Sequence, residues 1–359
     1  MTKFVEQKTK QIPVKYDDNI QSAINSHLDG LRQIWRLVRT VKMDPKLTES
    51  ERNESLARLF APLSYKDIQQ NFVMDGIKHD VGVSFRSSMA NMMRLKRRLR
   101  QRGYVIAPGG NNKVHDFQFG RQLGIPVPRT FADGVRAEML QLRAGTIIKP
   151  TQGANSQGVY LVQDDLSLLS IKTRMTYNDF EEAARAAGVD AVKSRWICEE
   201  AVLGADGNLA PDMKIYAFYG EPGLFIEIER GTGKNGRNRH ATFGPGGDRV
   251  DVNLKYEMMS GNGIPEGAAD IARTLSINTP VPFLRIDLLA GVNGCFLGEI
   301  TPHPGDTYAG DLRDQADREF GEMFLEAEAR LLIDLLEGKS FSSYFSVYGA
   351  SPSTTHPRS

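Results

Sequence analysis

The segment Arg285-Ile286-Asp287-Leu288-Leu289 is followed, after a glycine-bounded turn over residues 291–294, by Phe296-Leu297-Gly298-Glu299-Ile300-Thr301. Each of these apolar, strand-forming segments carries one carboxylate, and pairing around the turn lets Asp287 and Glu299 face one side. Two adjacent carboxylates raise each other's pKa unless a cation lies between them. Oxygen ligands of this kind suit Mg²⁺ held against nucleotide phosphates. Because two unpaired acids in a core hairpin are costly, we favour a metal site over a purely structural hairpin.

Arg285 lies two residues before Asp287, so its side chain is expected on the same face of the strand. A guanidinium in this position can stabilise charge on a transferring phosphoryl group.

A second informative segment is Thr146-Ile147-Ile148-Lys149-Pro150, followed by the loop Thr151-Gln152-Gly153-Ala154-Asn155-Ser156-Gln157-Gly158. Glycines let backbone N–H groups approach phosphate oxygens closely, and a lysine at the strand end adds positive charge. The Walker pattern is absent, because no Gly-x-x-x-x-Gly-Lys-Ser/Thr occurs here. An ordinary hairpin with a flexible turn is the structural alternative.

A third segment, Trp196-Ile197-Cys198-Glu199-Glu200-Ala201-Val202-Leu203-Gly204, is an apolar strand that ends in acids and an apolar linker. Such a linker can offer backbone groups to an adenine edge, while a carboxylate binds the amino group or the ribose. The next strand begins at Asp212 and carries Lys214 on one face. Taken alone, this region equally fits a surface strand with salt-bridging charges.

Around these segments the chain divides into a helical first part and an α+β remainder. Apolar residues at helical spacing run from Ile20 to Val38, and Thr48 with Glu51 forms a capping-box pattern before a second helix. A third helix is expected at 87–102. Strands are expected at 104–107, 146–149, 159–162, 196–199, 214–219, 224–229, 283–289 and 295–300, and helices at 114–123, 177–187, 266–275 and 313–336. We therefore expect a helical N-terminal region (1–103), two α+β lobes (104–200 and 201–345) and a flexible tail (346–359).

The composition is that of an ordinary globular protein, with 359 residues, 40% hydrophobic and 25% charged. A balance of 45 basic and 44 acidic residues disfavours a nucleic-acid binder. Two cysteines, Cys198 and Cys295, make a disulfide framework improbable and fit a reducing compartment. Neither a transmembrane segment nor a secretory signal is recognisable, so a cytoplasmic location is expected.

In their order along the chain, these segments resemble the ATP-grasp superfamily over residues 113–337, through the Lys-Pro strand end, glycine-rich loop, Glu-Glu linker, Arg-x-Asp strand and Glu-Ile-Thr strand. A run typical of the superfamily, Gly124-Ile125-Pro126-Val127-Pro128-Arg129-Thr130, follows the first lysine. The resemblance implies an ATP-grasp fold, with two α+β lobes clasping ATP and Mg²⁺ (or Mn²⁺). The nucleotide residues that it implies are Lys113, Lys149, Gln152, Ser156, Glu199, Glu200, Val202 and Asp212, with Asp206 as a rival to Asp212 at the ribose. The implied catalytic residues are Arg285 and Lys214, and the implied metal ligands are Asp287, Glu299 and Thr301.

Two features depart from the superfamily pattern. Thr301 occupies a position where the superfamily usually has asparagine, and the helical N-terminal region replaces the more common βαβ domain. The sequences around Asp212, Arg285 and Gly298 are most similar to the branch linked to teichuronopeptide and surface-polysaccharide biosynthesis.

Three further features point towards a substrate. The glycine-rich, basic segment 231–247 is expected to be either a mobile lid that carries Arg237 and Arg239, or a disordered surface loop. His303 is either a base near the acceptor or a histidine satisfied in its turn. The basic stretch over residues 94–102 is either an anion-binding face or, as we favour, a solvated helix face.

The expected activity is an ATP-dependent carboxylate–amine ligase that forms an amide through an acyl phosphate, on a sugar-acid or amino-acid substrate. A kinase on the same scaffold, acting on a hydroxyl or carboxylate, and a non-catalytic nucleotide-binding protein are the alternatives. The expected partners are a small-molecule carboxylate and an amine (or hydroxyl) substrate, with a homodimer left open.

Overall fold

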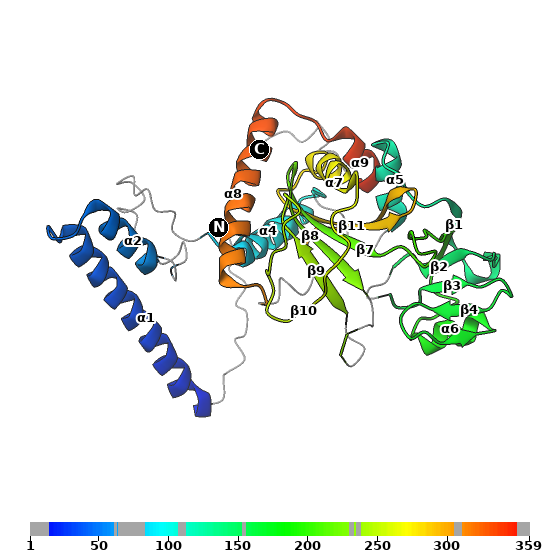
Figure 1. Cartoon of the computed structure of the whole chain (residues 1–359), viewed down its shortest axis with the longest axis horizontal. Coiled ribbons are helices and arrows are strands. Elements are labelled where there is room, and N and C mark those ends of the chain that lie inside the picture. The colour runs from blue at the N-terminus through cyan, green and yellow to red at the C-terminus, as the bar shows by residue number, and fades with distance from the viewer. Residues whose placement is uncertain are drawn as a thin grey trace, which may run out of the picture. The chain divides into compact units, whose positions relative to one another are not determined.

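A computed structural model describes residues 14–60, 63, 83–106, 113–152, 156–229, 233–234, 238–304 and 311–349 of the chain. The chain divides into two compact units, Met1–Val83 and Ser84–Ser359, each of which is described by itself (Figure 1). Among the described helices, none combines the length and the apolar character that a bilayer span requires.

The first unit contains α1 (Val14–Met43) and α2 (Glu49–Phe60). The capping box is present, because the Thr48 N–H donates to Glu51 Oε2 over 2.9 Å and the Glu51 N–H donates to Thr48 Oγ1 over 3.3 Å. The two helices share a small core of Trp35, Val38, Leu56, Phe60 and Leu63. The expected apolar stripe is buried only towards its C-terminal end, since Ile24 and Leu28 are exposed, while the side chain of Ile20 lies outside the described residues.

The second unit begins at α4, so this helix belongs with the α+β part of the chain and not with the helices before it. The Ser84 side chain caps α4 (Phe85–Arg100) by accepting from the Ser87 N–H. The Arg86 N–H and the Ser84 hydroxyl both donate to Asp317 on α8 (Asp314–Leu336). These bonds hold α4 beside α8.

A first six-stranded sheet has the order β1-β6-β2-β3-β4-β5, with antiparallel pairing throughout. Its strands are β1 (Thr130–Val135), β2 (Thr146–Pro150), β3 (Tyr160–Val162), β4 (Leu168–Ser170), β5 (Thr176–Tyr177) and β6 (Trp196–Glu200). Helix α6 (Phe180–Ala186) covers one face, where the Phe180 ring meets Trp196 at a centroid separation of 4.7 Å. The short 3-10 helix η2 (Ala137–Met139) follows β1.

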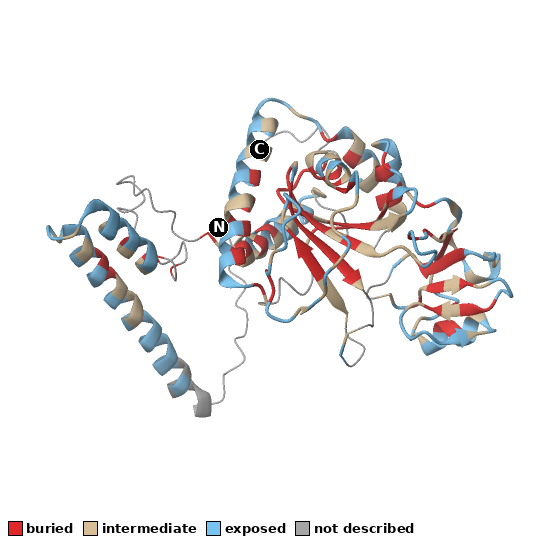
Figure 2. Ribbon diagram, in the orientation of Figure 1, coloured by how far each residue is buried: buried red, intermediate tan, exposed pale blue. Residues whose placement is uncertain are grey.

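A second six-stranded sheet has the order β10-β9-β8-β7-β11-β12. Its strands are β7 (Asp212–Phe218), β8 (Glu221–Glu229), β9 (Arg239–Phe243), β10 (Glu257–Met258), β11 (Leu284–Gly291) and β12 (Gly294–Thr301). Besides α4 and α8, it carries α5 (Lys113–Gln122), α7 (Ala268–Ile277) and α9 (Ser342–Tyr348). The buried residues gather along the strands of both sheets (Figure 2), so the expected α+β class with a helical N-terminal region is confirmed.

Four local predictions are wrong. Residues 104–106 form no strand, and Arg239–Phe243 is strand β9, where either a mobile lid or a disordered surface loop was expected. Helix α5 lies in the segment expected to form the first lobe, yet its Phe119 is buried in the core of the second sheet. Helix α9 extends into the expected flexible tail, because its Tyr344 and Tyr348 rings pack on Phe119. Residues beyond 349 lie outside the described part of the chain.

Candidate functional site

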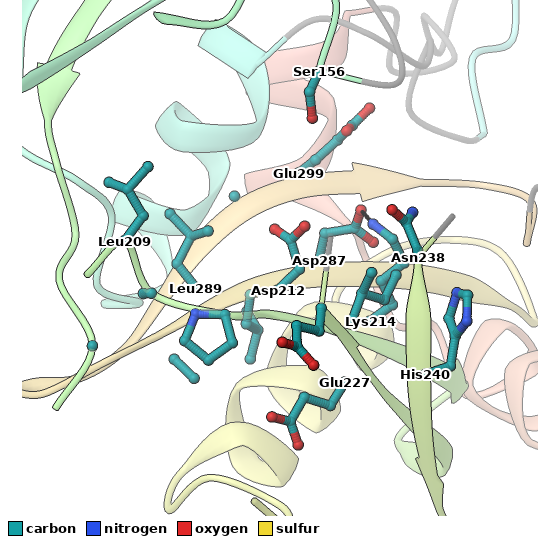
Figure 3. Close-up of a pocket in the computed structure, with 18 of the residues that line it drawn as sticks. Ser156, Leu209, Asp212, Lys214, Glu227, Asn238, His240, Asp287, Leu289 and Glu299 are labelled. Carbon is teal, nitrogen blue, oxygen red and sulfur yellow. Dashed lines mark hydrogen bonds and ion pairs between the residues drawn. The ribbon is translucent and has the colours of Figure 1, made fainter. Parts of the chain in front are cut away.

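A cleft of about 1640 Å³ is bordered by residues from both sheets (Figure 3). Most of the side chains expected at a nucleotide and metal site line it: Lys113, Lys149, Ser156, Glu199, Glu200, Val202, Asp212, Lys214, Arg239, Arg285, Asp287, Glu299, Thr301 and His303. Gln152 is exposed and is not among the lining residues, and Arg237 lies outside the described residues. The cleft thus brings together groups that are up to 190 positions apart, from Lys113 to His303.

A β-bulge aligns the two carboxylates of the β11–β12 hairpin. Leu288 pairs with Leu297, but the preceding residue, Asp287, pairs with Glu299. Gly298 is therefore the additional residue of the bulge. The backbones come very close there, since a Cβ on Gly298 would lie 3.2 Å from the Asp287 carbonyl oxygen. Glycine at this position therefore permits the register that puts Asp287 opposite Glu299.

Asp287 is the centre of a buried charge cluster. Its neighbour on β7 is Lys214, whose ammonium group donates to its carboxylate. Arg285 Nε donates to Asp287 Oδ1 over 2.8 Å, and Arg285 Nη2 donates to Thr301 Oγ1 over 3.1 Å. Although burial opposes ionisation, the charges of Lys214 and Arg285 hold the pKa of Asp287 below its ordinary value. Asp287 is therefore ionised at neutral pH, with Arg285 held in place on both sides.

Glu299 and Lys113 lie together at the neighbouring part of the cleft. Burial lowers the pKa of Lys113, the charge of Glu299 opposes this shift, and the charge of Lys149 adds to it. Within the described residues, the Glu299 carboxylate makes no hydrogen bond and no ion pair. Glu299 is thus an acid that is available to a ligand, and its charge acts on Lys113 and Arg285.

Lys149 is held by a buried ion pair. Its Nζ donates to Glu199 Oε1 over 2.6 Å, and it lies 5.0 Å from the centroid of the Phe117 ring on α5. Both charged side chains are nearly buried, with 9% and 3% of their surfaces exposed. Glu199 Oε2 is buried and has no hydrogen-bond partner among the described residues. A buried acceptor of this kind is costly unless a donor completes it.

Some of the backbone groups expected to contact a purine already have hydrogen-bond partners within the chain. The Glu200 N–H donates to the Arg129 carbonyl over 2.9 Å, and the Arg129 N–H donates to the Glu200 carboxylate over 3.0 Å. The Val202 carbonyl accepts from the Ala210 N–H over 2.9 Å. The contribution expected from the Glu200 backbone is thus reduced to its carbonyl.

The two candidate ribose acids differ in what they bind. Asp206 accepts from the Asn208 N–H over 3.0 Å and from Asn208 Nδ2 over 2.8 Å, so its carboxylate closes its own turn. Asp212 lies two residues before Lys214 on β7 and lines the cleft on the same face. Asp206 also lines the cleft, so both acids stay candidates for the ribose.

The glycine-rich loop is described on both sides of residues 153–155. Ser156 has φ 56° and Gly158 has φ 71°, which are left-handed conformations. Gln157 Nε2 donates to the Ala187 carbonyl over 2.6 Å, which fixes the end of the loop to the segment after α6. The Ser156 side chain lines the cleft.

The expected substrate residues have definite partners. Arg239 is on β9 and forms an ion pair with Glu229 over 2.6 Å. His303 lines the cleft just after β12, and burial, followed by the charges of Arg285 and Lys96, lowers its pKa. The hydroxyl of Thr301 accepts from Arg285, so it steers this guanidinium; its role as a metal ligand stays a prediction.

Several lining residues were not found by sequence reasoning. Glu227 is 3% exposed and accepts from the Asn262 N–H over 2.7 Å. Asn253 is also 3% exposed, and its Nδ2 has no partner among the described residues. The His240 ring stacks on Tyr256 at 4.0 Å. Only Glu227 left a signal in the sequence, namely an acid within an apolar strand, as at Asp287.

Asp116, also missed, ties three elements together behind the site. It is 2% exposed and accepts from Tyr348 Oη over 2.6 Å and from the Ile300 N–H over 3.0 Å. Burial raises the pKa of Asp116 to about 7, although both hydrogen bonds act in the opposite direction. Asp116 thereby links α5, the strand that carries Glu299, and α9.

We expect Asp116→Asn to flatten part of the dependence of stability on pH. Because the folded-state pKa is raised from 3.8 to about 7, the native protein binds a proton that the unfolded chain has released. The raised pKa of Asp116 therefore adds to the free energy of unfolding below pH 4. This contribution is lost as the pH rises towards 7, and the total loss is on the order of 4 kcal/mol. Urea unfolding at pH 5 to 8 should show that the free energy of unfolding of the variant rises relative to that of the wild type as the pH increases.

Tyr348→Phe is the matched control, because it removes a hydrogen bond that lowers the pKa of Asp116. In this variant the loss of stability should therefore occur at a higher pH than in the wild type. A free-energy difference between Asp116→Asn and the wild type that stays constant over this range would contradict the assignment.

Two six-stranded sheets that border one cleft lined by lysines and carboxylates form an ATP-grasp fold. The chain belongs to the TupA-like ATP-grasp family, whose model matches residues 115–325. The comparison with curated proteins gave no match.

Several solved structures are similar to this chain. D-alanine–D-alanine ligase from Bacillus anthracis has 14% identity and a TM-score of 0.41, covering 81% of this chain and 97% of that one. The D-cycloserine synthetase DcsG has 19% identity and a TM-score of 0.39, covering 69% and 80%. The ATP-grasp ligase PsnB, complexed with a phosphomimetic variant of its minimal precursor, Mg and ADP, has 13% identity and a TM-score of 0.37, covering 74% and 75%. Family membership rests on the family match.

Proposed function

We propose that this protein is an ATP- and Mg²⁺-dependent ligase that joins a carboxylate to an amine. The observation that carries the proposal is the convergence of Lys113, Lys149 and Lys214 with Asp287 and Glu299 on one cleft. Three ammonium groups match the charge of a triphosphate, and two acids match a divalent ion bound to it.

The residues present fit magnesium. Asp287 and Glu299 are cross-strand neighbours, and both line the cleft. Among the described residues there is no group of three or more His, Cys, Asp or Glu side chains suited to a metal. Mg²⁺ commonly binds through one or two carboxylates and completes its coordination with phosphate oxygens and water. Held by Asp287 and Glu299, the ion would neutralise phosphate charge.

The nucleotide base is proposed to lie at the first sheet. Glu199 Oε2 offers a buried acceptor without a partner among the described residues, which fits the exocyclic amino group of adenine. Lys149, held between Glu199 and Phe117, is proposed to reach the α- and β-phosphates. Asp212 is proposed to accept from the ribose hydroxyls.

In the proposed reaction, a carboxylate oxygen of the substrate attacks the γ-phosphorus, ADP leaves, and an acyl phosphate forms. Arg285, oriented by Asp287 and Thr301, and Lys214 stabilise the charge on the transferring group. An amine nitrogen then attacks the acyl carbon, loses its proton and expels inorganic phosphate, which leaves an amide. The chain's contribution is positioning and charge neutralisation, without a covalent enzyme intermediate.

Product analysis tests this function. The purified protein is first titrated with Mg²⁺ and the non-hydrolysable analogue AMP-PNP, and then incubated with Mg-ATP and panels of sugar acids, amino acids and amines. We expect ADP and inorganic phosphate to be released only when an acid and an amine are both present, with an amide detected by mass spectrometry. A stable phosphorylated acceptor would show that the protein is a kinase and not a ligase. Failure to bind AMP-PNP would contradict both activities.

A further inference from the structure

The outer edge of strand β12 is attached to helix α5 and the segment that follows it. Strand β12 is the outermost strand of the second sheet, and among the described residues no further strand pairs with it. The backbone N–H groups along such an edge need other acceptors. The Leu297 N–H donates to the Pro126 carbonyl over 2.9 Å, and the Ile300 N–H donates to the Asp116 carboxylate over 3.0 Å. A side chain of α5 thus takes the place of a neighbouring strand, at the residue next to Glu299.

The same turn of α5 carries the first lysine of the cleft. Lys113 begins α5 and lines the cleft, and Asp116 follows three residues later, about one turn further on. The helix lies close to β12, because a Cβ on Gly120 would lie 2.9 Å from Leu297 Cδ2. Asp116 is only 2% exposed, so its hydrogen bonds are shielded from solvent. The bond from Asp116 therefore joins the helix that carries Lys113 to the strand that carries Glu299.

The other oxygen of Asp116 connects this contact to the C-terminal helix α9. Tyr348 Oη donates to Asp116 Oδ1 over 2.6 Å, while the Ile300 N–H donates to Oδ2. The Tyr348 ring stacks on Tyr344 at 4.7 Å and meets Phe119 of α5 at 5.7 Å, between centroids. Helices α5 and α9 accordingly lie side by side (Figure 1). Because a helix of seven residues is not stable alone, α9 depends on these contacts with α5.

We propose that Asp116 is a positioning residue for the metal ligand Glu299, and that the C-terminal helix α9 controls this position through Tyr348. The inference rests on the proposed function, because it takes Glu299 as a ligand of Mg²⁺. Without the Tyr348 hydroxyl, one buried oxygen of Asp116 loses its partner, and the carboxylate is no longer held towards Ile300. Groups behind a metal ligand that orient it commonly change metal affinity by roughly 10- to 100-fold. Helix α9 is thereby part of the metal site, although none of its described residues lines the cleft.

The test measures how much Mg²⁺ contributes to nucleotide binding. AMP-PNP is titrated into the full chain by calorimetry, once in EDTA and once at saturating Mg²⁺, and the ratio of the two affinities gives the contribution of the metal. We expect Tyr348→Phe, which keeps the ring, to reduce this ratio about tenfold. Its affinity for AMP-PNP in EDTA should stay within about twofold of the wild type, which also shows that the variant is folded.

Tyr344→Phe is the matched control on the same helix. The Tyr344 hydroxyl is buried and has no hydrogen-bond partner among the described residues, so this change removes a hydroxyl without removing a bond. The contribution of Mg²⁺ should stay within about twofold of the wild type. Equal reductions in the two variants would overturn the positioning role. A Tyr348→Phe variant that unfolds at lower urea concentration but keeps the wild-type contribution of Mg²⁺ would overturn it as well.

A second variant tests whether the two residues act in one chain of contacts. Asp116→Asn leaves one acceptor oxygen in place of two, so it cannot hold both donors in the same way and should also reduce the contribution of Mg²⁺. The double variant with Tyr348→Phe should lose no more than the larger single loss, and losses that multiply independently would contradict a shared path. If Mg²⁺ gave the wild type no gain in AMP-PNP affinity, the proposed metal site would itself be overturned, and this inference with it.

Discussion

Glu299→Gln is expected to reduce the kcat of ATP turnover by about 10²- to 10³-fold, the loss seen when one preorganised electrostatic group is removed from a reaction centre. The amide keeps the size of the side chain but loses the charge that would hold a divalent ion against the triphosphate. Steady-state assays of ADP release at saturating Mg²⁺ measure the effect.

Stability should fall by no more than about 1 kcal/mol in this variant, because the Glu299 carboxylate has no hydrogen bond or ion pair among the described residues and only its longer-range attraction to Lys113 and Arg285 is lost. Glu326→Gln, which neutralises an exposed acid on α8, is the control and should retain wild-type turnover. If Glu299→Gln turned over ATP at the wild-type rate, the proposed role of the Asp287–Glu299 pair as metal ligands would be contradicted.

Lys149→Met should affect both nucleotide affinity and stability. Removing one partner of a buried ion pair leaves the other charge uncompensated, which costs about 3–5 kcal/mol of unfolding free energy. The Lys149–Glu199 pair is of this kind, with 9% and 3% of the side chains exposed. The lost contact to phosphate should weaken Mg-ATP binding by about ten- to a hundredfold. Urea unfolding and calorimetry measure the two effects.

The double variant Lys149→Met with Glu199→Gln separates these effects. Because neither side chain is then charged, most of the stability should return, while nucleotide binding should stay weak. Recovery of binding together with stability would show that Lys149 acts only as a structural partner of Glu199, and would contradict its proposed role at the phosphates.

Sequence reasoning anticipated many of the charged side chains that line the cleft, because charges in apolar strands are conspicuous. Lys149, Glu199, Lys214 and Asp287 each interrupt a run of buried residues, and each lines the cleft. It missed Asp116, because one acid in a short helix cannot be distinguished from a solvated helix residue until the partners on β12 and α9 are known. It also took Arg239 for a loop residue, because the short strand β9 has a weak pattern amid glycines and charges.

The assignment of helices to lobes depended on long-range packing. Helix α5 precedes the first sheet in the chain but buries Phe119 against the second, and α9 is ordered by stacking on α5. Local propensity has no information on such partners, so order along the chain suggested a first-lobe helix and a flexible tail. Both assignments were overturned by contacts between distant segments.

Residue types and their order by themselves determined an α+β chain, and predicted that lysines, a glycine-rich loop and two acidic strands meet at a nucleotide site. Only the tertiary structure decided that the two acids share a face. In a regular hairpin closed by Gly291 and Gly294, Asp287 would pair with Gly298, and Glu299 would pair with Ile286 and face the apolar side. Because side chains alternate along a strand, a shift of one residue reverses the face. The bulge at Gly298 makes that shift, and the close backbone approach it needs is visible only in three dimensions.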